Sequence, residues 1–245
     1  MDDPIFPISK NDRFTFSCNH RVACFNDCCQ DLNQYLTPYD ILRAKQHLGL
    51  PSSEFLSRYT CSHTGQASGL PVITLKTSPG AGVTCPFVKK EGCLIYNNRP
   101  ASCRLYPLAR ALSRDRKSGQ VTEQYFLIKE DHCGGFGSGK SWTVTEWLDD
   151  QGLHIYNEMN DKMMEIIHLK NCLMPGPLDT KSAHLCHMAL YDLDSFRHQI
   201  VEKGILGDNL PASDILEPVR SDDTALLNFA MTWIQQVLFS KGGRE

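Results

Sequence analysis

The chain has 245 residues, of which 41% are hydrophobic, and its formal net charge is -3. This length and composition allow a substantial buried core, and the scattered lysines and arginines exclude a broad positive field for nucleic acid or anionic membranes. No apolar run approaches the roughly 20 residues needed to span a bilayer, and the first residues lack the order of a signal peptide. We therefore expect a cytoplasmic protein without nucleic-acid or membrane partners.

Cysteine is the most informative residue type in the N-terminal half. The chain has eleven cysteines, four of them within the twelve positions 18–29 and three more in the segment 85–103. Because the cytoplasm keeps thiols reduced, such clusters there bind metal or carry out redox chemistry more often than they form disulfides. The alternative is a set of small buried apolar residues. That alternative is favoured for the isolated Cys61, Cys172 and Cys186.

Short helices and strands are expected around these clusters. Thr37-Pro38-Tyr39-Asp40 combines a hydroxyl cap, a proline and an acid, which predicts a helix ending near Gly49. A second helix is expected over 53–59. The stretches 70–77 and 123–130 have the composition of strands, and they bracket the second cysteine cluster. We expect them to form a small sheet under the metal site.

The segments around the cysteines carry a specific combination of residues. They are Cys24-Phe-Asn-Asp-Cys28-Cys29, the stretch 36–50, Cys85-Pro-Phe, Cys93-Leu-Ile-Tyr96-Asn-Asn-Arg99-Pro100, Cys103-Arg104-Leu-Tyr106-Pro107, and Cys133 followed by glycines. Over about residues 14–150 the chain thereby resembles the cysteine-cluster family named for its CxxCxxCC signature, a zinc- or iron-chelating domain. The chain departs from the plainest pattern in the spacing of Cys18, Cys24 and Cys28.

The resemblance implies a metal centre with eight candidate ligands, Cys18, Cys24, Cys28, Cys29, Cys85, Cys93, Cys103 and Cys133. They can form two four-thiolate sites or hold one larger cluster. Because adjacent side chains diverge, we expect Cys28 and Cys29 to face different metals. An iron–sulfur cluster is the favoured cofactor and zinc the alternative, since so many thiolates exceed what folding alone requires.

Two arginines flank Cys103 and are candidate cofactor-binding residues. Arg99 and Arg104 could offset the charge of the thiolates or donate hydrogen bonds to their sulfurs. The alternatives are binding of an anionic substrate and an ordinary surface salt bridge. Prolines 100 and 107 are expected to stiffen the peptide around this cysteine.

Residues 134–141 match the phosphate-binding pattern GxxxxGK[ST]. We reject a nucleotide site because no strand leads into the glycines and the next helix cap falls later, at Thr143 or Thr145. Among the histidines, His20 and His132 could replace a thiolate. His184, Cys186 and His187 could form a minor metal site, although a packed or solvated helix face is the simpler interpretation.

The remainder of the chain has the pattern of helices. The capping-box sequence Thr143 to Glu146 starts apolar residues at helical spacing as far as Ile167, with its methionines expected in the core. Further helices are expected over about 182–203 and 222–239. The predicted fold is α+β and mostly helical, with a metal-organised cysteine-rich domain over 1–142 and a helical region over 143–245 packed on it.

Three functional classes agree with this pattern. The first is an iron–sulfur oxidoreductase, or a related redox protein, acting on a small molecule or partner protein. The second is a protein-modifying enzyme similar to the flagellin lysine N-methylases, which share the cysteine core; the chain shows no glycine-rich methyltransferase motif. The third is a zinc-stabilised interaction module. The sequence indicates no catalytic residue, substrate or oligomeric state.

Overall fold

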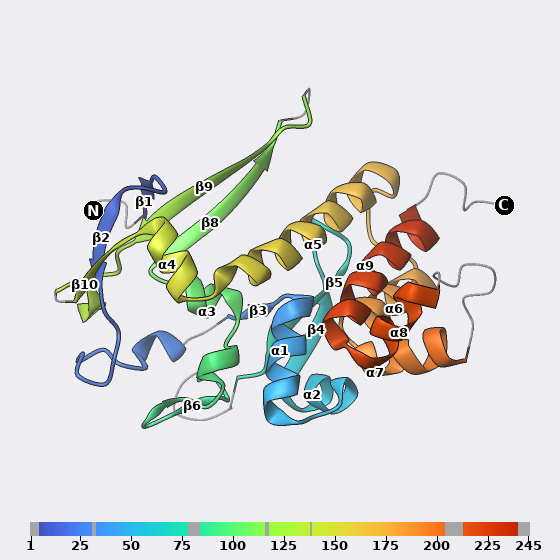
Figure 1. Ribbon diagram of the computed structural model, residues 1–245, viewed down its shortest axis with the longest axis horizontal. Coiled ribbons are helices and arrows are strands. Elements are labelled where there is room, and N and C mark those ends of the chain that lie inside the picture. The colour runs from blue at the N-terminus through green and yellow to red at the C-terminus, as the bar shows by residue number, and fades with distance from the viewer. Residues whose placement is uncertain are drawn as a thin grey trace.

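The computed structural model describes residues 5–30, 33–77, 84–115, 118–137, 139–203 and 213–239. Its architecture is α+β and mostly helical with small antiparallel sheets, which confirms the predicted fold class. In Figure 1 the N-terminal strands and the cysteine-bearing loops lie at one end of the molecule. The C-terminal helices lie at the other, and the long helix α5 (Leu153–Leu173) runs between them. No helix in the described ranges is long and apolar enough to cross a membrane.

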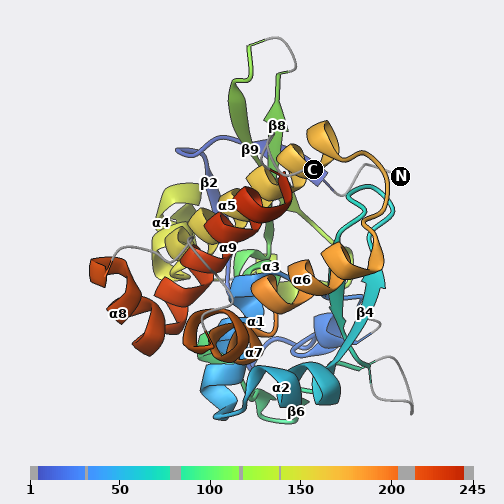
Figure 2. The same ribbon diagram turned by 90° about the vertical axis from the view of Figure 1, so that its right-hand side faces the viewer.

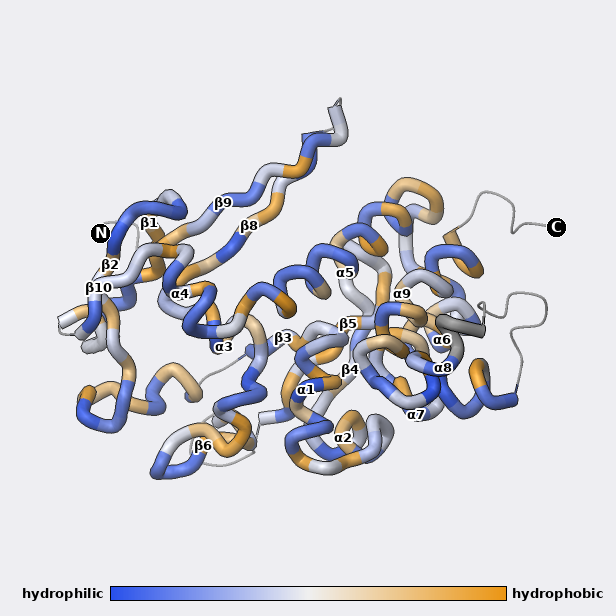
Figure 3. The backbone as a smooth tube through the Cα atoms, viewed as in Figure 1, coloured by the Kyte–Doolittle hydropathy of each residue, from blue (hydrophilic) through white to orange (hydrophobic). Residues whose placement is uncertain are grey.

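Two antiparallel sheets form the far N-terminal end. One has the order β1-β9-β8, with β1 (Ile5–Ile8), β9 (Val121–Ile128) and β8 (Leu108–Arg114). The other pairs β2 (Arg13–Phe16) with β10 (Lys140–Thr143). The β8–β9 ribbon projects from the body of the molecule (Figure 1), and hydrophilic residues interrupt its apolar ones along its length (Figure 3). Its base is buried against the core while its tip is exposed, since Leu108 and Leu127 are buried and Val121 is exposed.

Two smaller sheets lie nearer the middle of the chain. The three-stranded one has the order β3-β5-β4, with β3 (Tyr35–Leu36), β5 (Pro71–Leu75) and β4 (Thr60–Thr64). The other is the short hairpin of β6 (Val88–Lys89) and β7 (Gly92–Cys93).

The strands predicted over 70–77 and 123–130 are present as β5 and β9, but the expected common sheet is wrong. They belong to different sheets, because each pairs with a strand close to it in sequence, β5 with β4 and β9 with β8. Pairing with a strand close in sequence closes a shorter connecting segment than pairing across the cysteine loops would. It therefore costs less conformational entropy.

The helix predicted from Thr37 is α1 (Pro38–Leu48). The Asp40 amide donates to Thr37 Oγ1 at 3.3 Å, the Thr37 amide donates to Asp40 Oδ2 at 2.9 Å, and Gly49 ends the helix with φ 64°. The positive φ explains the glycine, because other residues are strained there. Helix α2 (Ser52–Tyr59) follows, as expected.

The helix expected from residue 143 to residue 167 is two helices. Thr143 and Glu146 form the predicted capping box of α4 (Val144–Asp150), and α5 starts after Gly152. Gly152 has φ 61°, a left-handed conformation that a continuous helix does not contain. Met159 and Met163 of α5 are in the core as predicted, whereas Met164 is exposed.

The helix expected over 182–203 is also interrupted. It begins as α6 (Thr180–Leu190), stops at Tyr191, and resumes as α7 (Leu193–Phe196), which continues as a π-helical segment over Arg197–Glu202. The break follows from Asp192, whose carboxylate accepts hydrogen bonds from the Ser195 amide and hydroxyl and so caps a new helix.

The last two helices are α8 (Ser213–Ser221) and α9 (Asp223–Phe239), the second of which the sequence predicted. Helix α9 contacts α1, α5, α6 and α7, so one apolar core includes residues from both halves of the chain. A buried charge network ties the same helices together. Lys45 Nζ of α1 lies 3.2 Å from Asp194 Oδ2 and 3.0 Å from Asp223 Oδ2, and Arg197 also pairs with Asp223.

Candidate metal centre

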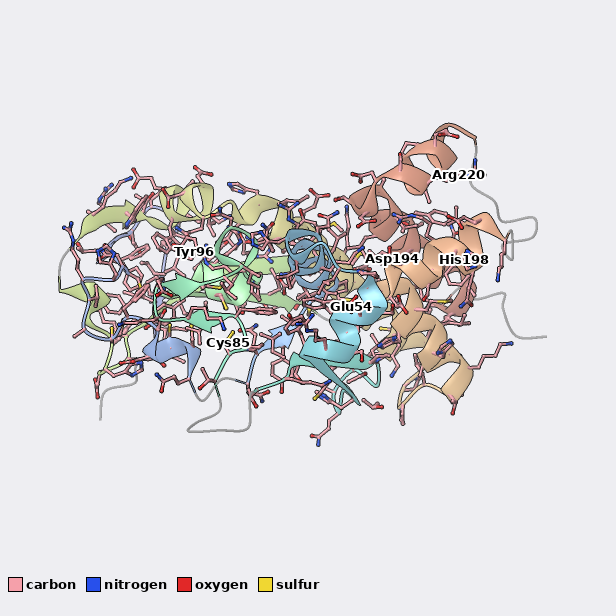
Figure 4. The ribbon with its side chains drawn as sticks, turned by 90° about the horizontal axis from the view of Figure 1, so that it is seen from below. Glu54, Cys85, Tyr96, Asp194, His198 and Arg220 are labelled. Atoms are coloured by element: carbon pink, nitrogen blue, oxygen red, sulfur yellow. The ribbon has the colours of Figure 1, made fainter. Side chains whose placement is uncertain are left out.

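The eight candidate cysteines lie on short, irregular elements. Cys18 and Cys24 lie in the loop after β2, and Cys28 and Cys29 form the end of a 3-10 turn, Asp27–Cys29. Cys93 ends β7 and Cys103 lies in α3 (Ala101–Leu105). The remaining two, Cys85 and Cys133, lie in loops. Viewed from below, the labelled Cys85 and Tyr96 lie at the end of the molecule away from Asp194, His198 and Arg220 (Figure 4).

Backbone hydrogen bonds bring the sequence-distant segments together. The Cys85 amide donates to the Cys29 carbonyl at 2.9 Å, and the Asn26 side chain donates to the Lys89 carbonyl at 2.9 Å. Asn26 has φ 75°, a conformation that asparagine tolerates better than most residues. The turn before Cys28 is therefore fixed against the β6–β7 hairpin.

The helix that carries Cys103 is positioned by α1. Asp40, only 2% exposed, accepts a hydrogen bond from the Ala101 amide at 2.8 Å through Oδ1. The same carboxylate caps α1 through Oδ2. The buried Asp40 side chain thus fixes the start of α1 and of α3. Burial raises the pKa of this carboxyl group.

A first group of four thiols includes Cys18. Burial, followed by the negative charges of Cys28, Cys24 and Cys133, raises the pKa of Cys18 to about 11. The Gly134 amide donates to Cys24 Sγ at 3.2 Å, which holds Cys24 beside the Cys133 segment. We define Cys18, Cys24, Cys28 and Cys133 as the first group.

A second group of four thiols includes Cys103. Burial, followed by the charges of Cys85, Asp40 and Cys93, raises the pKa of Cys103 to about 12. Burial and the charges of Cys93 and Cys28 likewise raise the pKa of Cys85, so Cys28 also acts on this group. Cys29 belongs here because Cys85 and Cys103 are among the charges that raise its pKa. We define Cys29, Cys85, Cys93 and Cys103 as the second group.

The two groups meet at the adjacent cysteines. A hydrogen bond from Cys29 lowers the pKa of Cys28 to about 7, and the same bond raises the pKa of Cys29. Cys28 therefore carries substantial thiolate character at neutral pH, while its neighbour keeps its proton. In the part of the chain that the structure describes, no three His, Cys, Asp or Glu side chains form a ready-made shell around one ion.

The two arginines beside Cys103 make different contacts. Arg104 donates to the backbone carbonyls of Arg99 at 3.1 Å, Gln151 at 2.8 Å and Asn97, and its guanidinium stacks 4.8 Å from the Tyr156 ring. It braces the loop before Cys103 against α5. Within the described structure, its hydrogen bonds go to backbone carbonyls and not to cysteine sulfurs.

Arg99 is the cation that faces the cysteines. Its positive charge acts on Cys18 of the first group and on Cys93 and Cys103 of the second. Its guanidinium stacks 3.9 Å from the centre of the Tyr96 ring and donates to the Tyr96 carbonyl at 2.6 Å and to the Gln151 side chain.

Three further residues contact the cysteines and were not expected to do so. Cys103 Sγ donates to Gln34 Oε1 at 3.5 Å, and Tyr106 hydrogen-bonds to Cys133 and donates to Glu130 at 3.0 Å. Burial and these contacts raise the pKa of Tyr106. The Gly134 amide binds Cys24, as described above. The glycines after Cys133 were a sequence signal for this backbone contact. Nothing in the sequence around Gln34 indicates its contact with Cys103.

The other candidates differ in how they lie relative to the two groups. His20 is exposed, while His132 lies 3.8 Å from Glu130 and close enough to lower the pKa of Cys28. Cys186 is fully buried, so the segment 184–187 does not present its cysteine at the surface together with its histidines. Lys140 and Ser141 of the GxxxxGK[ST] match lie in β10 and not at a helix start. The isolated Cys61 is exposed on β4, and Cys172, on α5, lies 3.8 Å from His168.

Clustered thiols on loops, with neighbouring positive charge and a protein core beneath, define a metal-chelating protein. The family model described as "Putative zinc- or iron-chelating domain", CxxCxxCC, matches residues 17–134. This segment of the chain belongs to that family, as the sequence predicted. Searches of curated proteins and of solved structures find no match.

Proposed function

We propose that the eight cysteines bind iron–sulfur clusters in two four-thiolate sites, one for each group, and that the chain is a redox protein or an iron–sulfur-dependent enzyme. The observation that carries this proposal is a pair of hydrogen bonds, from the Gly134 amide to Cys24 Sγ at 3.2 Å and from the Cys85 amide to the Cys29 carbonyl at 2.9 Å, which bring the sequence-distant cysteine segments together. Four cysteines per cluster is the usual ligand set of [2Fe–2S] and [4Fe–4S] centres.

The charge of the site supports a cationic cofactor. Within each group, the negative charges of neighbouring thiolates disfavour ionisation of a thiol. Metal binding nevertheless requires the thiols to lose their protons. A metal centre supplies the positive charge that stabilises the thiolates. Arg99 adds a fixed cation between the groups, which is the proposed role of this residue toward the cofactor.

The apolar core supports iron–sulfur over purely structural zinc. Structural zinc typically stabilises small domains that lack a sufficient core. Here the cysteine loops rest on buried residues of the same continuous core, among them Phe16, Phe87 and Ile95, which are 1–3% exposed. The fold around the site thus has stabilising contacts of its own, which leaves the thiolates available for a chemical role.

The exposure of the cysteines supports electron exchange at the surface. Cys18 and Cys28 are exposed, and the large apolar side chains of Leu94 and Tyr96, which follow Cys93 in the sequence, are 52% and 55% exposed. When bound, an iron–sulfur cluster supplies one-electron transfer. This chain would hold the cluster edge within reach of a partner or small substrate.

Anaerobic purification followed by iron, zinc and acid-labile sulfide analysis tests the proposal. We expect coloured protein with iron and sulfide in similar amounts. Colourless protein that contains zinc and no sulfide would contradict the iron–sulfur assignment.

Single variants test the division into two groups. Cys28→Ser and Cys29→Ser are each expected to lose about half of the bound iron, because each removes a ligand from a different group. Cys172→Ser, an exposed cysteine on α5, is the matched control and should keep all of it. Full iron content in both test variants would contradict the two-site arrangement.

A further inference from the structure

A buried lysine lies at the helical end of the molecule, away from the cysteines. Lys170, in the last turn of α5, is only 1% exposed. Its Nζ donates a hydrogen bond to the carbonyl oxygen of Gly176. Among the described residues, no carboxylate forms an ion pair with it. A buried ammonium ion without a counter-charge is costly, because burial removes its hydration.

The groups around Lys170 do not supply the missing charge. Its charge acts on the buried thiol of Cys186, but burial raises the pKa of Cys186 to about 12, so that thiol is neutral at physiological pH. The carbonyls at the end of α5 provide only a partial negative charge, equivalent to roughly half an elementary charge.

A cavity of about 260 Å³ adjoins the lysine. Its walls come from the β4–β5 turn, including Thr64, Gly65, Gln66 and Gly69, and from Lys170 and Gly176 on the opposite side. Thr64, Gln66 and Ala67 of its lining are exposed, so the cavity is open to solvent and a ligand can enter it. The cavity therefore has room for a small ligand.

The two walls of the cavity are fixed to each other. The Leu178 amide donates to the Gly69 carbonyl at 3.3 Å, and a Cβ at Gly69 would overlap with the Gly176 carbonyl and Lys170 Nζ. Gly69 also has φ 65°, so glycine is required there by both space and conformation. Figure 2 shows the β4–β5 turn beside the connection from α5 to α6.

The cavity also offers neutral hydrogen-bond donors. Within the described structure, the backbone amides of Gln66 and Ala67 have no protein acceptor, while the neighbouring Gly65, Gly69 and Leu70 amides are satisfied within the turn. Thr64, which carries a hydroxyl, and Gln66, which carries a carboxamide, are among the residues that line the same cavity. A buried cation with amide and hydroxyl donors around it is the usual composition of an oxyanion site.

We infer that this cavity binds a small oxyanion, with Lys170 as its counter-ion. The ligand class is a small molecule carrying a carboxylate or phosphate group, which both present acceptor oxygens to an ammonium ion and backbone amides. The site is separate from the cysteine groups, and the inference does not depend on which metal they bind.

Isothermal titration calorimetry on the full metal-loaded chain tests the inference. Inorganic phosphate is titrated in one arm and succinate in the other, each at constant ionic strength set with chloride. We expect saturable binding in at least one arm, and the stronger arm identifies the anionic group. Absence of saturable binding in both arms would overturn the inference.

Substitutions locate the binding. Lys170→Met removes the charge at similar length, and we expect at least tenfold weaker anion binding. Lys181→Met, which removes an exposed positive charge from the first turn of α6, should bind as the wild type does. Equal binding by the Lys170→Met variant would place the anion elsewhere.

A second variant and a measurement on the unmodified chain guard against misfolding. Lys170→Gln keeps a donor for the Gly176 carbonyl without the charge and should show the same loss. In the wild-type chain, saturating anion should raise the midpoint of thermal unfolding, and the Lys170→Gln variant should lack this rise. An equal rise in both chains would contradict the assignment.

Discussion

The cysteine end and the helical end of the molecule are held together in different ways. The cysteine loops consist of turns, two-residue strands and the five-residue helix α3, and most of their cysteines are half-buried or exposed. The helical end contains the 21-residue helix α5 and the 17-residue helix α9, with Ile166, Leu226 and Ile234 fully buried. The first relies on specific hydrogen bonds between short loops that rest on a few buried residues, whereas the second relies on apolar burial along long helices. This difference predicts that the two ends respond separately to the same perturbations.

Metal removal is expected to have the largest effect, confined to the cysteine end. Without a cation, the thiols of each group become protonated, and the short elements lose the ligand that links them. Amide exchange in residues 17–30 and 84–104 should accelerate roughly tenfold or more after chelation, because metal binding and local folding are coupled. Hydrogen exchange with mass spectrometry measures this. Equal acceleration in α5 and α9 would show that the ends are not independent.

A cavity in the helical core should lower global stability and leave metal content unchanged. Phe196 is fully buried and its ring lies 5.3 Å from that of Trp233. Phe196→Ala should reduce the free energy of unfolding by about 3–5 kcal/mol. Denaturant unfolding and metal analysis on the same sample provide the two readings. Met164→Ala, at a side chain that is 46% exposed, is the control and should change stability by about 0.5 kcal/mol or less.

The buried charges that join α1 to α7 and α9 should make stability depend on pH. Burial alone would raise the pKa of Asp223, but hydrogen bonds and charges from Arg197 and Lys45 lower it overall. A lowered pKa stabilises the fold above the unfolded value of about 3.9, and this contribution is lost as the pH falls through the folded value.

The Asp223→Asn variant isolates that contribution. We expect it to cost about 3 kcal/mol near pH 7, because Lys45 is left buried with one carboxylate fewer. The difference from the wild type should shrink below about pH 4, where the native carboxylate becomes protonated. Unfolding curves at several pH values measure it, and a pH-independent difference would rule out a charge effect.

The smallest effect is expected at the cap of α1. Thr37→Ala should cost about 1 kcal/mol, because the Asp40 amide loses its side-chain acceptor. Thr37→Ser keeps the hydroxyl and should retain most of the stability. Comparison of the two midpoints of thermal unfolding measures the cap, and equal loss in both variants would indicate that the methyl group of Thr37 matters instead.

The sequence predicted features that depend on local chemistry. The helix start at Thr37 and the cap at Thr143 were identified because capping residues act within one turn. The breaks at Gly152 and Asp192 were missed although both residues favour them, because the apolar periodicity continues across each break. Strands β2 and β10 were missed because each is four residues long and paired with a segment more than a hundred residues away.

The sequence predicted which cysteines make up the candidate site, but not how they are arranged in space. The spacing of the cysteines marked them as neighbours along the chain, and the adjacent pair suggested two directions. Two hydrogen bonds determine which distant cysteines lie near Cys28 and which lie near Cys29. One joins Cys85 to Cys29, and the other joins Gly134 to Cys24. Gln34 gave no signal, because its contact with Cys103 exists only in the folded chain.

Gln151 links the cysteine end of the molecule to the long helix α5. Its carbonyl and side chain bind Arg104 and Arg99 at the cysteine end, and α5 begins two residues later. At 1.5 Å per residue, α5 is a rod of about 31 Å. Because metal loss is expected to affect only the cysteine end, these contacts should hold the start of the rod in place, and Lys170 beside the proposed oxyanion cavity should not move. Unchanged exchange of residues 174–178 in metal-free protein would show that the rod stays fixed, whereas faster exchange would show that a tilt at Gln151 is transmitted along it.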